Sequence, residues 1–143
     1  MTSSSRPKHK PRPGVDRGGR TPLHNAVIDQ DAALVRKLLS GGADTNVQDD
    51  GGLTPLHFAS ARKSLEIVRM LLDEKADVDP EDLHGNTPLS NAVFSSRGYG
   101  DIIQALRAAG ASPHHANQHG VSPLKLARTI ANYPISQYFA DLP

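Results

Sequence analysis

The chain has 143 residues, enough for one domain, and it contains neither Cys nor Trp. The lack of Cys excludes disulfides, thiolate metal sites and Cys nucleophiles, and it fits a reducing compartment. No apolar run reaches the ~18–20 residues that span a bilayer. The N-terminus lacks the apolar stretch of a secretory signal, so we expect a cytoplasmic protein without membrane insertion.

Charge is unevenly distributed along the chain. Residues 1–20 hold six basic residues and one acidic residue, whereas the remainder holds ten basic and fourteen acidic residues. Residues 1–15 contain three Pro, three Ser and no apolar periodicity, so we predict a disordered basic tail. Such a tail either keeps the chain soluble or binds nucleic acid or an anionic membrane surface. The absence of interleaved aromatic residues favours the first role, and we expect no nucleic-acid partner.

A four-residue motif recurs through the rest of the chain. It is Thr-Pro-Leu-His at 21–24 and 54–57, Thr-Pro-Leu-Ser at 87–90 and Ser-Pro-Leu-Lys at 122–125, with spacings of 33, 33 and 35 residues. A second marker keeps the same steps: Gly-Ala at 42–43, Lys-Ala at 75–76 and Gly-Ala at 110–111. Two markers with one spacing indicate an internal structural repeat.

The stretch from Gly51 to His84 shows the repeated unit most clearly. Thr54 suits a helix N-cap, and Pro55 suits the first helical position. Two apolar stripes then predict two short helices, one through Leu56, Ala59 and Ser60 and one through Leu65, Val68, Leu71 and Leu72. Gly ends the second helix in two sister units, so Lys75 must adopt a left-handed conformation or the helix must end differently. Such short helices gain stability by stacking on neighbouring units, which predicts a solenoid.

The motif T-P-L-H-x-A at a period of 33 residues resembles the ankyrin repeat. The resemblance implies an all-α ankyrin-repeat solenoid of helix–turn–helix units with hairpin-like connecting loops. We place this domain at residues 16–143, with three full repeats and a degenerate C-terminal capping repeat; their bounds are about 16–48, 49–81, 82–116 and 117–143. The family's motif histidine is usually structural, so we expect His24 and His57 to form hydrogen bonds within the fold.

The third and fourth units depart from the pattern. The third is two residues longer, and the excess lies at 95–100. This insertion is either a tolerated loop or a contact loop, for which Arg97 and Tyr99 are suitable residues. Arg107 stands where the sister units have Leu, so the apolar stripe is weaker there unless its stem packs. The fourth unit carries charge in its first helix, as a terminal repeat with a polar outer face requires.

The sequence contains no pattern that predicts catalysis or a cofactor. It has no G-x-S-x-G, no phosphate-binding Gly loop followed by Lys-Ser/Thr and no H-E-x-x-H. His114, His115 and His119 lie in a loop without a carboxylate or thiolate that completes a metal site. Residues 44–51 lack the central Gly and terminal Glu of a calcium loop. We therefore predict that the protein is not an enzyme and has no catalytic, cofactor-binding or metal-binding residues.

The resemblance implies that a partner protein contacts the loop tips and the exposed sides of the first helices. Carried over by position, together with the insertion, the predicted partner-binding residues are Arg17, Arg20, Asn25, Asp50, Leu53, Phe58, Arg62, Leu83, His84, Asn86, Asn91, Phe94, Arg97, Tyr99 and His119. Leu53, Phe58, Leu83 and Phe94 are apolar, and we expect them to form one stripe, although Phe58 is also placed to pack between units. The acidic residues at 77–82 form either a solvated edge or a contact for a basic partner.

We therefore expect a monomeric, non-catalytic protein that binds another protein through its concave face. One interpretation is an inhibitor or immunity protein that neutralises a cognate toxin or effector. The alternatives are a signalling or transcription adaptor, or a protein that binds nucleic acid or a membrane surface through its basic tail. The first two interpretations rest on analogy with the architecture.

Overall fold

The computed structural model describes residues 12–130 and 134–143 of the chain, and within these ranges the regular elements are all helical. The helices are α1 (Pro22–Ile28), α2 (Ala32–Ser40), α3 (Pro55–Ala61), α4 (Leu65–Asp73), α5 (Pro88–Ser95), α6 (Asp101–Ala108), α7 (Pro123–Thr129) and the 3-10 helix η1 (Ile135–Phe139). The predicted all-α fold is confirmed. The predicted disordered tail falls mainly on residues 1–11, which lie outside the described part.

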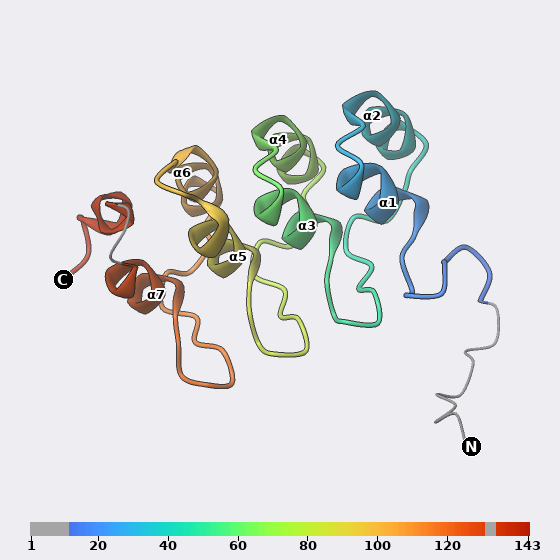
Figure 1. Cartoon of the computed structure of the whole chain (residues 1–143). Coiled ribbons are helices and arrows are strands. Elements are labelled where there is room, and N and C mark those ends of the chain that lie inside the picture. The colour runs from blue at the N-terminus through green and yellow to red at the C-terminus, as the bar shows by residue number, and fades with distance from the viewer. Residues whose placement is uncertain (1–11, 131–133) are drawn as a thin grey trace, which may run out of the picture.

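The helices form two rows (Figure 1). The first helices of the four units, α1, α3, α5 and α7, lie side by side in one row, and the second helices lie in another row above it. The loops at 41–54, 74–87 and 109–122 extend below the first row like hairpins. The first and last units stand at opposite ends of this array, and the main helix–helix contacts lie within a unit or between adjacent units, as in a solenoid.

The second unit buries the residues that its periodicity selects. In the second unit Leu56, Ala59 and Ser60 of α3 are buried, and Val68 and Leu71 of α4 are fully buried. The remaining stripe residues are partly buried against the same core. The sequence interpretation missed α4's fully buried Ile67, which is off the predicted stripe. A wider face is buried because α4 packs against α2 and α6 as well as α3.

Lys75 occupies the left-handed conformation that Gly adopts in the sister units. Its φ is 60°, against 87° at Gly42 and 99° at Gly110. Helix α4 therefore ends in the same way as α2 and α6, with a lysine at a position that favours glycine. The Cβ of a non-glycine residue in this conformation costs about 1 kcal/mol.

The fourth unit packs against the insertion in the third. The Tyr138 hydroxyl, on η1, donates a hydrogen bond to the Gly98 carbonyl at 3.3 Å. A Cβ on Gly100 would overlap the Tyr138 ring, so this ring lies directly against the glycine backbone. The loop at 95–100 thus packs directly against η1 of the fourth unit.

Arg107 joins the third unit to the same cap. Its guanidinium donates to both carboxylate oxygens of Asp141 at 2.7 and 2.8 Å and to the Tyr138 carbonyl at 2.8 Å. It also lies 5.2 Å from the centre of the Phe139 ring. The hydrogen bonds to Asp141 raise the pKa of Arg107 and lower that of Asp141. The residue that interrupts the leucine stripe is therefore used to hold the last helix.

None of the helices in the described part is long and apolar enough to cross a membrane.

Candidate functional site

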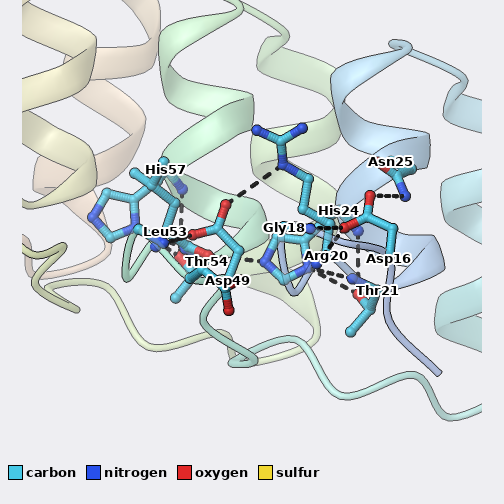
Figure 2. Close-up of polar contacts among 12 residues, drawn as sticks. Asp16, Gly18, Arg20, Thr21, His24, Asn25, Asp49, Leu53, Thr54 and His57 are labelled. Carbon is cyan, nitrogen blue, oxygen red and sulfur yellow. Dashed lines mark hydrogen bonds and ion pairs between the residues drawn. The ribbon is translucent and has the colours of Figure 1, made fainter. Parts of the chain in front are cut away.

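The motif histidines are buried and join consecutive units (Figure 2). The Nδ1 atom of His24 accepts the backbone N–H of Thr21 at 3.1 Å, so Nε2 carries the proton and donates to the Leu53 carbonyl at 2.9 Å. His57 repeats this arrangement with Thr54 at 3.0 Å and the Asn86 carbonyl at 2.9 Å. Burial lowers the pKa of His57. The predicted structural role of both histidines is confirmed.

A third periodic marker, which the sequence interpretation missed, shapes the loop tips. One side-chain oxygen in each loop accepts the backbone N–H groups two and four residues later at 2.8–3.0 Å. The residues are Asp16, Asp49, Asp82 and Asn117, again spaced by 33, 33 and 35. Figure 2 shows the first two of these side chains. Asp and Asn favour such turns, so a search for the same spacing would have found them.

A groove of about 550 Å³ lies along the row of first helices, from the second unit to the fourth. Its apolar surface comes from Leu53, Phe58, Ala61, Phe94, Val121 and Leu126, and the other lining residues are His57, Asn86, Ser90, Asn91, Ser95, Asn117 and His119. These lining residues, all in the described part of the chain, include no carboxylate, ammonium or guanidinium group. The groove therefore suits a ligand that offers an apolar side chain together with polar backbone groups.

A family model described as ankyrin repeats (3 copies) matches residues 23–117, more than half of the chain. The chain belongs to the ankyrin repeat family. The helix pairs, hairpin-like loops and buried motif histidines are the features that this family predicts. No curated protein was found to match the chain. Ankyrin repeats indicate a protein–protein interaction module, and proteins of this family are generally non-catalytic.

The groove of this ankyrin repeat protein brings together six predicted partner-binding residues: Leu53, Phe58, Asn86, Asn91, Phe94 and His119. The other nine lie outside its lining. The predicted apolar stripe is shorter than expected, because Leu83 lies exposed on a loop tip apart from the groove. In the described structure, Phe94 is the one exposed large hydrophobic residue that lines the groove, and 78% of the residue's surface is accessible.

The predicted contact residues outside the groove have several different surroundings. Asn25 donates to Asp16 at 3.3 Å, and Asp50 forms an ion pair with Arg12 at 2.9 Å. Arg17 and His84 are exposed at loop tips, Arg62 follows α3 as its C-cap, and Arg97 and Tyr99 are exposed in the insertion. The side chains of Asn25 and Asp50 are therefore already engaged within the protein.

Phe58 has the double role that the sequence left open. Its ring meets His24 edge-on at 6.0 Å between centroids, and the Arg20 guanidinium lies 5.3 Å from its centre. Arg20 also approaches Asp49 at 3.6 Å. Phe58 therefore forms a fixed wall of the groove while it packs between the first two repeats.

The acidic loop at 77–82 is partly used within the fold. Asp82 shapes the loop tip, Asp79 accepts the backbone N–H of Ser112 at 3.0 Å, and Glu81 lies 3.5 Å from the ring of His115. Fewer acidic groups remain for a basic partner than the sequence suggested.

Ser90 was not predicted to be functional, yet it shapes the groove. It stands where the first two repeats have His24 and His57, whose rings reach the next loop tip. Serine is too short to do so, and Ser90 lines the groove together with Asn117 and Val121 of the next tip. The Thr87 hydroxyl of the same repeat is buried without a hydrogen-bond partner in the described structure. In the described structure, Ser90 thus lines the groove and forms no counterpart of the hydrogen bonds by which His24 and His57 join the first two junctions.

The histidines of the third loop do not assemble a metal site in the described structure. Within residues 12–130 and 134–143 there is no group of three or more His, Asp or Glu side chains placed to hold a metal ion. His114 is exposed, His115 approaches Glu81 and His119 lines the groove.

Proposed function

We propose that this ankyrin repeat protein binds a partner protein by enclosing an apolar segment of it in the groove along α3, α5 and α7. The observation that carries the proposal is the exposed ring of Phe94 in a groove whose lining has no formally charged side chain other than its histidines when protonated. Exposed apolar surface of this kind is typical of interaction sites, and aromatic residues are frequent anchors. A partner that covers Phe94 gains the free energy of removing this ring from water.

Asn91 supports recognition of a polypeptide in particular. It lines the groove from α5, and in the described structure its side chain makes no hydrogen bond. At the equivalent position of the first repeat, the Asn25 amide is bonded to Asp16. A primary amide offers both a donor and an acceptor, so Asn91 suits the N–H and C=O groups of a bound backbone.

We propose inhibition as the consequence of this binding. A small domain without predicted catalytic residues acts on a partner by covering its surface, as an inhibitor or an immunity protein covers a toxin or effector. This role rests on the architecture, and a signalling or transcription adaptor rests on it equally. An inhibitor blocks the activity of its captured partner, whereas an adaptor leaves that activity intact and holds a second protein.

The groove is tested by substitution at its walls. Wild-type protein is used to capture a partner, which is identified by mass spectrometry and measured by calorimetry. Because hot-spot aromatics contribute 2 kcal/mol or more, we expect Phe94→Glu to weaken binding at least about 30-fold, with a similar loss for Leu53→Glu. Leu83→Glu is the matched control, since Leu83 is exposed and apolar but lies outside the groove. Wild-type affinity in both folded groove variants contradicts the proposal.

The domain boundary and the basic tail are tested by deletion of residues 1–15. We propose that residues 16–143 fold and bind the partner alone, so that the deletion removes only any affinity for polyanions. Loss of partner binding on deletion assigns the contact to the tail instead of the groove.

A further inference from the structure

A basic rim adjoins the groove at the ends of α3 and α5. The groove reaches Ala61 and Ser95, the last residues of these two helices. The chain then continues into Arg62, Lys63 and Arg97, which are all exposed. In the described part of the chain, none of the three lies within 4.0 Å of a carboxylate. A ligand that leaves the groove along these helices meets unpaired positive charge.

Helix capping does not explain this charge. Gln30, Lys63 and Arg97 have φ values of 57°, 59° and 48°, so they occupy equivalent turns in three successive repeats. In the first repeat, the residues on either side of this position are Asp29, the C-cap of α1, and Asp31. If the α-helix dipole dictated a cation at this turn, the first repeat would have one as well. Among the three repeats whose turn the structure describes, basic residues occur at this turn only in the second and third, whose first helices α3 and α5 line the groove.

A second hollow, of about 210 Å³, lies beside the same helix ends. Lys63 and Tyr99 line it, with the Lys63 Nζ atom 5.8 Å from the centre of the Tyr99 ring. Ser60 also lines it, and its buried hydroxyl has no hydrogen-bond partner in the described structure. Asp101 is the one acidic lining residue, and its carboxylate accepts the backbone N–H of Ile102 at 2.9 Å. The three cations outnumber this carboxylate, so the rim attracts anionic groups.

We propose that the segment bound in the groove carries an Asp or Glu side chain close to its apolar residue, and that Arg62, Lys63 and Arg97 hold this carboxylate. The inference rests on the proposed function. The groove takes the apolar side chain, and the rim fixes the direction of the segment across α3 and α5. An exposed ion pair changes affinity by about two- to five-fold, so three cations together give about tenfold or more and a clear salt dependence.

A library of random 12-residue peptides displayed on phage, selected against the full chain, provides the probe. We expect enriched sequences to combine an apolar residue with a nearby Asp or Glu. A synthetic peptide of the enriched sequence is then measured by fluorescence polarisation at low and high salt. Lys63→Gln combined with Arg62→Gln and Arg97→Gln should weaken this peptide about tenfold at low salt, with little difference at high salt. The matched control combines Lys37→Gln, Arg69→Gln and Lys75→Gln, which remove three exposed cations outside both hollows. It should bind the peptide within about twofold of wild type.

The outcomes separate this inference from the proposed function. Enriched peptides without acidic residues, or an acidic peptide that binds the rim variant as it binds wild type, overturn the acidic-segment proposal and leave the groove in place. No enrichment at all, or tighter binding of a single-stranded oligonucleotide at the rim, also overturns it. If Phe94→Glu leaves peptide and partner binding unchanged, the groove itself is not the binding site.

Discussion

The Nε2 atom of His57 lies 2.9 Å from the carbonyl oxygen of Asn86, and this buried contact joins the second repeat to the third. The other ring nitrogen accepts the backbone N–H of Thr54 at 3.0 Å. One side chain thus satisfies two backbone groups that belong to different repeats. His24 does the same at the first junction, whereas the third junction has a serine in that position.

Removal of this contact should destabilise the protein strongly. His57→Ala leaves two backbone groups without partners and a cavity between repeats, so we expect the free energy of unfolding to fall by about 2–4 kcal/mol. Urea denaturation followed by circular dichroism measures the change. Ser90→Ala is the matched control, because Ser90 bridges no junction in the described structure, and it should cost less than about 1 kcal/mol. Equal losses in the two variants would contradict the role of His57.

Stability should also depend on pH through His57. Burial lowers its pKa in the folded protein, whereas the unfolded chain keeps the ordinary value of 6.5. Between these two values the unfolded state binds more protons, so this contribution to stability decreases as pH falls below about 6.5 and is constant above it. We expect the urea midpoint to drop between pH 7.5 and 5.5, and to drop less in His57→Gln. An unchanged slope in His57→Gln would exclude His57 as the cause.

Ser90→His should stabilise the fold and impair binding. The introduced ring can accept the N–H of Thr87 and reach the carbonyl of Val121, which is equivalent to Leu53 and Asn86 in the earlier junctions. We expect a gain of about 1 kcal/mol in unfolding free energy. The same ring fills the groove beside Asn117, so the captured partner should bind more weakly than it binds wild type. Denaturation and calorimetry on one sample test both effects. A stable variant with full affinity would show that the space at Ser90 is not used.

Much of the fold was predictable because the motif residues act within their own repeat. Thr54 caps its helix, Pro55 begins it and Leu56 lies on its buried face. The structural role of His57 was predictable too. Its acceptor, Asn86, was not, because the motif does not specify which carbonyl of the next loop comes within reach.

The candidate site was predictable only in part, for a related reason. Periodicity places Phe58 and Phe94 on first helices and Leu53 in the loop just before one, and all three line the groove. The motif shows a serine in place of histidine at position 90, but it does not show how closely the next loop tip approaches this residue. That approach depends on packing between repeats and has no local sequence signal. The contact between Gly100 and Tyr138 could not be predicted either, because no repeated spacing in the sequence relates these two residues.

Lys75→Gly should raise stability. Lys75 has a φ of 60°, a conformation that glycine adopts without the Cβ penalty. Because glycine also increases the freedom of the unfolded chain, we expect a net gain of about 0.5 kcal/mol. Lys75→Ala removes the same charge and keeps the Cβ, so it should give no gain. If both variants shift the urea midpoint equally, the effect comes from charge and not from backbone conformation.

Gly100→Ala should loosen the C-terminal cap. The φ of Gly100 is −106°, which alanine adopts readily, so any cost comes from packing and not from the backbone. A Cβ at this position overlaps the Tyr138 ring, which must move and give up its hydrogen bond to Gly98. We expect a loss of about 1–3 kcal/mol and faster hydrogen exchange in η1. Tyr138→Ala removes the ring that the methyl group meets, so the double variant should cost clearly less than the sum of the two single variants. If the stability losses of the two single variants add strictly in the double variant, the two residues do not interact, and the insertion at 95–100 does not hold η1 in place.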